Sequence, residues 1–251
     1  MSYSRTVFPP GSLHHAAEIG SVAALQEAEA DGARRGYPPL VVLTTKDEIL
    51  GAQPLHISAE KGRLDVIKYL ARKGVDLDAG DGAMVTALQL AAIKNAAACV
   101  AALLDAGANP TRQDAGGDQA LHWAATKGHV QVVELLLDRG AIIDAANRLG
   151  WTALHRAAYC GRVGAVRALL RHGAGILALT ADLMTPLHLA AKNNQLGAME
   201  ALLAAGARPG LSDAAGRNVA AVCPGDAGRE LLAQFEERRA QRKQQRGGGG
   251  G

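Results

Sequence analysis

Five histidines of this 251-residue chain stand in nearly the same local sequence, which reads PLHISA, ALHWAA, ALHRAA and PLHLAA at the four clearest places. Histidine can coordinate a metal ion or transfer a proton near neutral pH. Metal ligands must converge on one point, however, and a general base needs a nucleophile within hydrogen-bond distance. The sequence shows no zinc-ligand spacing, and no serine or cysteine recurs beside the five residues, which are His14, His56, His122, His155 and His188. Both chemical roles are therefore disfavoured.

The elements that position these histidines follow a strict period. One leucine per unit recurs every 33 residues, at Leu55, Leu88, Leu121, Leu154 and Leu187. Glycine or asparagine stands seven residues after each of these leucines and glycine stands nineteen residues after each. Both residue types tolerate the left-handed backbone that ends a helix, and apolar residues at helical spacing lie between the two stops. Each unit is predicted to be a short helix, a tight turn, a longer helix and an extended connector.

The pattern extends in both directions with changes. Leu13, Gly20 and Gly32 keep the offsets of seven and nineteen residues, but the next repeat begins nine residues late. Downstream, Pro224 stands where a first helix should run, and a helical stretch resumes from about Ala227. We predict an array over residues 1–235, made of a divergent N-terminal repeat (6–50) with an inserted connector, five repeats from about 48 to 212 and a truncated C-terminal capping repeat (213–235).

The inserted connector contains the apolar stretch PPLVVLTT, residues 38–45. Its β-branched composition predicts an extended finger. The finger can pack back on the array, which the general avoidance of exposed apolar edges favours, or it can offer an edge to a partner strand.

A 33-residue helix-turn-helix unit with the motif T-P-L-H-x-A resembles the ankyrin repeat. The stretch TPLHLAA at Thr185–Ala191 matches this motif fully, whereas repeat two departs most, with Gln89 in place of the histidine and Met84 in place of the usual glycine. The resemblance covers roughly residues 6–235. It implies an all-α ankyrin-repeat solenoid with short extended or β-hairpin connectors. It also implies a structural role for His56, His122, His155 and His188, whose side chains would fix the connector turns by hydrogen bonds to the backbone.

The resemblance implies a non-catalytic protein–protein interaction module (an adaptor, inhibitor or assembly factor) that binds a partner on its concave face. Contacts in the family come from connector tips and from exposed first-helix positions. Aromatic residues and arginine dominate interface energetics, so Trp151, Tyr159 and Arg148 are the expected anchors, although Trp151 could equally pack along the neighbouring connector. Transferred position by position, the candidates are Gly82, Val85, Ile93, Lys94, Ala115, Asp118, Thr126, Lys127, Arg148, Leu149, Trp151, Tyr159, Cys160, Asp182, Met184, Lys192 and Asn193.

Two other functions stay open. The chain can be a permanent structural subunit of a larger assembly, or its basic tail can contact nucleic acid or an acidic partner. The chain carries a net charge of +3, and residues 236–246 alone supply this value with five basic and two acidic residues. The body therefore sums to zero, which argues against nucleic-acid binding by the body. We expect the helix after Phe235 to fray within a few turns and Gly247–Gly251 to be disordered, because nothing apolar follows Phe235.

The remaining features argue against catalysis and membranes. No glycine-rich phosphate loop or suitably placed carboxylate pair is present, so we expect neither an enzyme nor a cofactor, metal or small-molecule site. The longest apolar stretch, Ala96–Leu104, is too short to span a bilayer, and no secretory signal is evident. The three cysteines lack a paired spacing, which indicates a reducing compartment, the cytoplasm or the nucleus.

Overall fold

The computed structural model describes residues 11–247 of the chain, and the side chains as far as residue 241. The chain forms two compact units. The first contains the residues up to Ala124 together with His129–Ile142, and the second contains Ala125–Gly128 together with the residues from Ile143 onward. Apart from two isolated β-bridges, at Gly80–Thr86 and Ser212–Asn218, the regular structure of residues 11–247 is helical.

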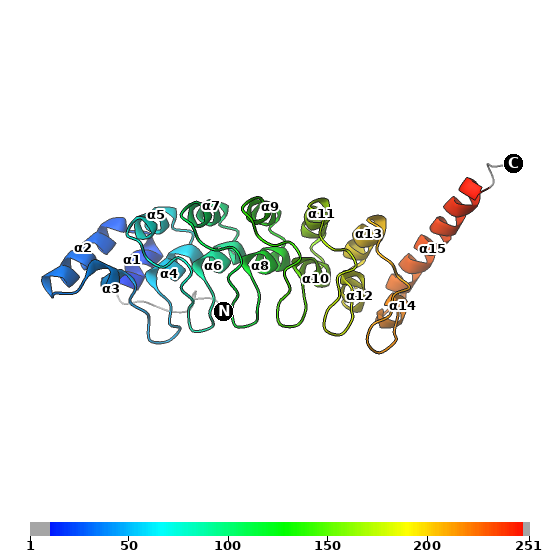
Figure 1. Ribbon diagram of the computed structural model, residues 1–251, viewed down its shortest axis with the longest axis horizontal. Coiled ribbons are helices and arrows are strands. Elements are labelled where there is room, and N and C mark those ends of the chain that lie inside the picture. Colours follow the sequence, from blue (N-terminus) through cyan, green and yellow to red (C-terminus); the bar gives the residue numbers. More distant parts are fainter. Residues whose placement is uncertain (1–10, 248–251) are drawn as a thin grey trace. The chain divides into compact units, whose positions relative to one another are not determined.

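The first unit consists of successive helix pairs (Figure 1). First helices pack on first helices, α1 on α4 and α4 on α6, while second helices pack on second helices, α5 on α7 and α7 on α9. The last residues of α8 belong to the second unit. The bounds are α1 Leu13–Ile19, α2 Val22–Arg34, α3 Pro39–Leu43, α4 Pro54–Glu60, α5 Leu64–Arg72, α6 Ala87–Ile93, α7 Ala97–Asp105, α8 Ala120–Lys127 and α9 Val130–Asp138.

The second unit continues the same scheme (Figure 1). Helix α10 packs on α12 and α12 on α14 in one layer, α11 packs on α13 in the other, and α15 covers α13 and α14. Helix α14 has only four residues and ends at Val222, just before Pro224, which agrees with the interruption predicted there. The bounds are α10 Ala153–Tyr159, α11 Val163–Arg171, α12 Pro186–Lys192, α13 Leu196–Ala204, α14 Val219–Val222 and α15 Asp226–Gly247.

The short first helices stop where the sequence predicts, and threonine begins three of them. Thr86, Thr152 and Thr185 are the N-cap residues of α6, α10 and α12, and each side-chain oxygen accepts a hydrogen bond from the backbone N–H three residues later. The turn that follows each first helix has a positive φ at the glycine or asparagine position, with values of 68°, 58°, 80°, 65° and 52° at Gly62, Asn95, Gly128, Gly161 and Asn194.

The core lies between the helix layers of each unit. The five recurring leucines are each at most 2% exposed, and the alanine pairs that follow the motif histidines, such as Ala157 and Ala158, are fully buried. Small alanine side chains let neighbouring first helices approach closely, while each buried leucine contributes about 1.5–3 kcal/mol. The repeated sequence positions therefore serve the packing of one repeat on the next.

The insertion after the first repeat is not the extended finger that its composition predicts. Pro39–Leu43 form the short helix α3, because Pro39 has the fixed φ that suits the first turn of a helix. Leu43 is 1% exposed, and α3 packs back on α2. The insertion packs back on the array as expected. The predicted extended conformation was wrong, because tertiary contacts override β propensity.

Gly32 is not a helix stop either, since α2 continues through it to Arg34. A Cβ atom at Gly32 would lie 2.4 Å from Cγ2 of Val42, so this glycine makes room for α3.

The tail after Phe235 begins as a continuation of the capping helix. Helix α15 continues without a break past Phe235 to Gly247, so residues 236–247 belong to the same helix as the cap. Glutamate, glutamine, arginine and lysine are good helix formers, which explains why the helix persists beyond its last apolar contact. Gly247 is its final residue, and the disorder expected for Gly248–Gly251 concerns positions outside the described residues.

Candidate functional site

The motif histidines link each first helix to the connector of the following repeat. In repeat four, Nδ1 of His155 accepts a hydrogen bond from the backbone N–H of Thr152 at 3.1 Å, and Nε2 lies 3.1 Å from the carbonyl oxygen of Met184. A ring nitrogen that accepts from an N–H carries no proton, so the proton is on Nε2, which donates to the carbonyl. His188 repeats the arrangement with Thr185 and with Leu211, whose carbonyl oxygen is 3.0 Å away.

The same geometry recurs in the first unit. His56 accepts from the N–H of Gln53 and lies 3.0 Å from the carbonyl oxygen of Ala79 through Nε2. Nε2 of His14 lies 2.9 Å from the carbonyl oxygen of Ala52, and Nδ1 of His122 accepts from the N–H of Gln119. Burial lowers the pKa of His56 and of His188, which keeps both rings neutral. Rings engaged at both nitrogens are poor candidates for metal binding or proton transfer, and this supports the structural interpretation.

Repeat two satisfies the same backbone groups with an amide. Oε1 of Gln89 accepts from the N–H of Thr86 at 2.7 Å, and Nε2 donates to the carbonyl oxygens of Asp118 at 2.7 Å and of Arg112 at 3.3 Å. Gln89 is 1% exposed, so these bonds form away from solvent. The substitution that makes repeat two the least regular in sequence therefore preserves its hydrogen bonding.

A second set of links between repeats was missed by the sequence analysis. At three of the positions eight residues after a recurring leucine, a long polar side chain reaches the carbonyl at the end of the preceding first helix. Nε of Arg63 donates to Glu18 at 2.8 Å, and Nε of Arg162 donates to Thr126 at 3.0 Å. Nε2 of His129 lies 3.1 Å from the carbonyl oxygen of Ile93. Helix C-termini leave carbonyls without intrahelical partners, and the recurrence of long donor side chains after the turn was the available signal.

The hairpin tips of successive repeats are joined through the backbone. The N–H of Gly82 donates to the carbonyl of Leu50 at 2.8 Å, and that of Ala115 to Ala83 at 3.0 Å. In the second unit the N–H of Ala181 donates to Leu149 at 3.1 Å. These bonds fix where the tip side chains stand relative to the helices beneath them.

The candidate contact residues of the first unit are only partly accessible. Lys94, Gly82 and Ala115 are exposed, whereas Val85 and Ile93 are half-buried. Nζ of Lys94 forms an ion pair at 3.2 Å with Oε1 of Glu60, whose side chain is 1% exposed. Asp118 is buried, at 4% exposure, and its backbone N–H and carbonyl are hydrogen-bonded to the side chains of Asp114 and Gln89. The expectation that Asp118 belongs to an open surface is wrong.

The candidates of the second unit are mostly open. Trp151, Thr126 and Cys160 are half-buried. Met184 is buried beneath the hairpin at 6% exposure, so the expectation that it is exposed is wrong. Its neighbour Leu183, which the sequence analysis did not select, is 47% exposed instead. The exposed candidates are Lys127, Arg148, Leu149, Tyr159, Asp182, Lys192 and Asn193.

Trp151, Tyr159 and Arg156 form one cluster in repeat four. The rings of Trp151 and Tyr159 meet edge to face with centroids 5.2 Å apart, and the guanidinium of Arg156 lies 5.2 Å above the Trp151 ring. Tyr159 is 37% exposed, and its carbonyl oxygen accepts from Nδ2 of Asn193 at 2.8 Å. Trp151 thus packs within its own repeat and at the same time holds two polar-tipped side chains at the surface.

Two hairpin tips carry exposed apolar residues in a backbone conformation that favours glycine. Met84 has φ 61° and Leu183 has φ 55°, at the hairpin position where repeat four has Gly150. The left-handed conformation costs a residue with a side chain about 1–2 kcal/mol. Met84 is 52% exposed and Leu183 is 47% exposed, so neither recovers this cost by burying its side chain fully.

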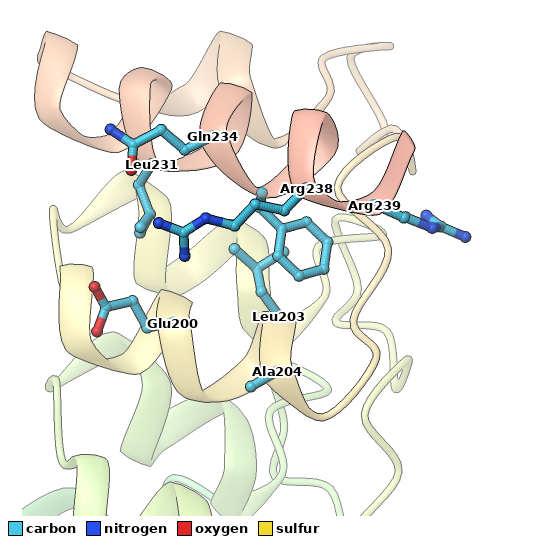
Figure 2. Close-up of a pocket in the computed structure, with 8 residues that line it drawn as sticks. Glu200, Leu203, Ala204, Leu231, Gln234, Arg238 and Arg239 are labelled. Atoms are coloured by element: carbon cyan, nitrogen blue, oxygen red, sulfur yellow. The ribbon is translucent and has the colours of Figure 1, made fainter. Parts of the chain in front are cut away.

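A cavity of about 630 Å³ lies between α13 and α15 (Figure 2). The Arg238 side chain extends across it toward Leu231 and Glu200, whereas Arg239 points away. Leu203 of α13 is 3% exposed beneath it. The apolar side chains on the inward face of α15 support a capping role for this helix. The lining residues are Glu200, Leu203, Ala204, Leu231, Gln234, Phe235, Arg238 and Arg239.

The family model described as ankyrin repeats (3 copies) matches residues 13–114, 55–147, 109–179 and 145–213. The chain belongs to the ankyrin repeat family. The all-α ankyrin-repeat solenoid expected from the motif is confirmed as its fold class. Ankyrin repeats are generally protein–protein interaction modules and typically non-catalytic scaffolds, so protein partners are implied.

Solved structures agree with this assignment. The ankyrin repeat domain of Bcl-3, a member of the IkappaB protein family, superposes with a TM-score of 0.75 at 27% sequence identity, covering 88% of this chain and 97% of that one. The human ASB11 ankyrin repeat domain superposes with a TM-score of 0.75 at 28% identity, covering 90% and 97%. No curated protein matches the chain in sequence.

None of the helices within residues 11–247 is long and apolar enough to cross a membrane. No group of three or more His, Cys, Asp or Glu side chains in this part of the chain is placed to hold a metal ion.

Proposed function

We propose that this protein is a non-catalytic binding module that holds a partner protein on the concave face of its repeats, as an adaptor, inhibitor or assembly factor. The observation that carries the proposal is the cluster of Trp151, Tyr159 and Arg156 in the second unit. The proposal includes a cytoplasmic or nuclear location, which rests on cysteine usage in the sequence.

The cluster has the composition and rigidity of an interface anchor. Aromatic residues and arginine are enriched among the residues that dominate binding energy. The Tyr159 ring packs against the Trp151 ring, so little freedom of this side chain is lost when a partner binds, and the hydrogen bond from Asn193 fixes the backbone carbonyl of Tyr159. The exposed side chains of Leu149 and Leu183 stand on hairpin tips that the backbone fixes, and they extend the apolar part of the surface.

The experiment compares binding by a double aromatic variant in repeat four with binding by a single aromatic control variant elsewhere. Partners are first captured on the wild-type protein and identified by mass spectrometry, and the affinity of each is then measured. Trp151→Ala combined with Tyr159→Ala removes the cluster. Tyr37→Ala is the control, because Tyr37 is 56% exposed and lies in the first unit, before α3.

We expect the double variant to bind at least about tenfold more weakly, which corresponds to about 1.4 kcal/mol, while the control binds normally. Thermal unfolding checks that the double variant stays folded. An unchanged affinity would refute the repeat-four site and would direct attention to residues 38–45. A partner that copurifies in equal amounts and buries well over 2,000 Å² would instead indicate the permanent structural subunit.

A further inference from the structure

The charge of the chain is unevenly distributed. No acidic residue occurs between Asp144 and Asp182, whereas this stretch contains five arginines. The whole chain carries +3, residues 236–246 supply +3 and residues 145–181 supply +5, so all other residues together carry −5. The neutral total of the body conceals a basic repeat four. The five arginines are Arg148, Arg156, Arg162, Arg167 and Arg171.

Two of these arginines belong to the same face as the aromatic cluster. Arg148 is exposed on the hairpin tip beside Leu149, and Arg156 is stacked on Trp151. Arg167 and Arg171 are exposed on α11, the second helix of the repeat. Arg162 lies in the turn between α10 and α11, where Nε is bonded to the carbonyl of Thr126.

Hydrogen bonds bring two lysines to the same face. The bond from Arg162 to Thr126 places the end of α8, with exposed Lys127, next to the end of α10. The bond from Asn193 to Tyr159 places the end of α12, with exposed Lys192, on the other side. We define the basic strip as Lys127, Arg148, Arg156 and Lys192.

Few acidic groups oppose the strip within the second unit. Asp182 is exposed on the next hairpin tip, and Oδ1 of Asp144 accepts from the N–H of Gly175 in the connector beyond α11. The exposed parts of the first helices α10 and α12 carry no acid, since their residues 153–159 and 186–192 contain none. Like charges held on one face favour an anionic ligand.

We propose that the basic strip, together with Tyr159 and Leu149, binds an acidic segment of the partner protein. This inference rests on the proposed function and names the chemistry of the partner. Carboxylates of the segment would pair with Arg148 and Arg156, because a guanidinium matches a carboxylate through two parallel hydrogen bonds and stacks well on an aromatic face. Apolar side chains of the segment would contact the Tyr159 ring and the Leu149 tip.

A protein ligand fits the strip better than a nucleic acid. Stacking of bases needs open aromatic faces, but the Trp151 ring is covered by Arg156 on one face and meets the Tyr159 ring edge to face. Apolar tips such as Leu149 and Leu183 suit peptide side chains rather than a phosphate backbone.

A library of random twelve-residue peptides displayed on phage tests the proposal. Three proteins are used for selection: the wild type, a strip variant and a control variant with the same loss of charge. The strip variant carries Arg148→Gln, Arg156→Gln and Lys192→Gln. The control carries Arg167→Gln, Arg171→Gln and Arg208→Gln, all at exposed positions of the second unit outside the strip. Circular dichroism melts establish that both variants are folded.

We expect peptides selected on the wild type to be enriched in aspartate and glutamate relative to the input library. Their affinity should be at least about tenfold lower for the strip variant but less than about threefold lower for the control. The affinity of these peptides for the wild type should also fall when salt is added. Peptides without acidic enrichment, or an equal loss in both variants, would overturn the proposal. The proposal would also be overturned if the wild type bound a twelve-nucleotide single-stranded RNA more tightly than the selected peptides and the strip variant lost this RNA binding.

Failure of this inference is distinguishable from failure of the proposed function. Peptides or partners that depend on Trp151 and Tyr159 but are neutral would refute only the acidic preference. Partners that bind the double alanine variant of these two residues normally would refute the site itself.

Discussion

Repeats two and four use different side chains to hydrogen-bond equivalent backbone groups. In repeat four the ring nitrogens of His155 serve the N–H of Thr152 and the carbonyl of Met184. In repeat two the two ends of the Gln89 amide serve the N–H of Thr86 and the carbonyl of Asp118. The position therefore requires one acceptor and one donor at a fixed separation, and it does not require an imidazole. A residue recurring for this reason is evidence about the fold rather than about catalysis.

The two repeats differ again at the hairpin tip. Repeat four has Gly150 with φ 74°, whereas repeat two has Met84 with φ 61°. At the buried position the exchange preserves every bond, but at the exposed tip it introduces backbone strain. The buried position therefore restricts side-chain chemistry to groups that supply one acceptor and one donor, whereas the exposed tip accepts a side chain at a cost in backbone strain.

Removing the linking side chain should have the largest effect. His155→Ala and Gln89→Ala should each lower the free energy of unfolding by about 1–3 kcal/mol, because buried backbone groups lose their partners. Urea denaturation measures this. His172→Ala is the control, since His172 is an exposed C-cap residue and its replacement should change stability by less than about 0.5 kcal/mol. Equal effects at 155 and 172 would contradict the structural interpretation.

Acidification should weaken the repeats that use histidine. Burial lowers the pKa of His188 in the folded chain, while the unfolded chain titrates near 6.5. Below that pH the unfolded chain binds more protons, so stability is complete above about pH 6.5 and falls as the pH is lowered through the folded pKa. His188→Gln should show a smaller loss between pH 7 and pH 5 than the wild type.

The pH window separates this effect from a neighbouring carboxylate. The hydrogen bond from Arg217 lowers the pKa of Asp213 from 3.8, so the stability that Asp213 contributes is lost only in more acidic solution. If the unfolding free energy of His188→Gln falls as steeply as that of the wild type between pH 7 and pH 5, His188 is not the titrating group.

Exchanging histidine and glutamine between positions 155 and 89 should have a smaller effect on stability. Gln89→His and His155→Gln each retain an acceptor and a donor, so each should cost less than about 1 kcal/mol by the same urea measurement. An exchange as damaging as the alanine variant at either position would show that the ring geometry matters more than the pair of hydrogen bonds.

Replacing Met84 at the hairpin tip by glycine should have the smallest effect, and this effect should have the opposite sign. Met84→Gly should raise the unfolding free energy by about 0.5–1 kcal/mol, because relief of the left-handed strain exceeds the added backbone entropy of glycine. Gly150→Ala should lower it, since a Cβ there would lie 2.8 Å from the backbone nitrogen of Ala181. Thermal melts detect both changes, and a less stable Met84→Gly variant would mean that the Met84 side chain packs usefully.

The repeat architecture follows from local patterns in the sequence. Helix starts at Thr152 and Thr185, and helix ends at Gly161 and Asn194, depend on capping and backbone conformation within a few residues. Such local preferences, repeated every 33 residues, specify the fold because each unit buries its leucine and alanines against an equivalent neighbour. The same reasoning assigned the motif histidines to the connectors, since a position that recurs with the fold serves the fold.

The accessibility and the surroundings of the variable residues depend on how side chains pack in three dimensions. Val42 lies in a helix because its side chain fits against Gly32, and Met184 is buried while Leu183 is exposed because the hairpin turns with a positive φ at Leu183. The stacking of Arg156 on Trp151 likewise depends on two side chains five residues apart that meet across a turn. These features are set by distances between atoms that no local pattern encodes, because surface side chains adopt the positions that their neighbours in space leave open.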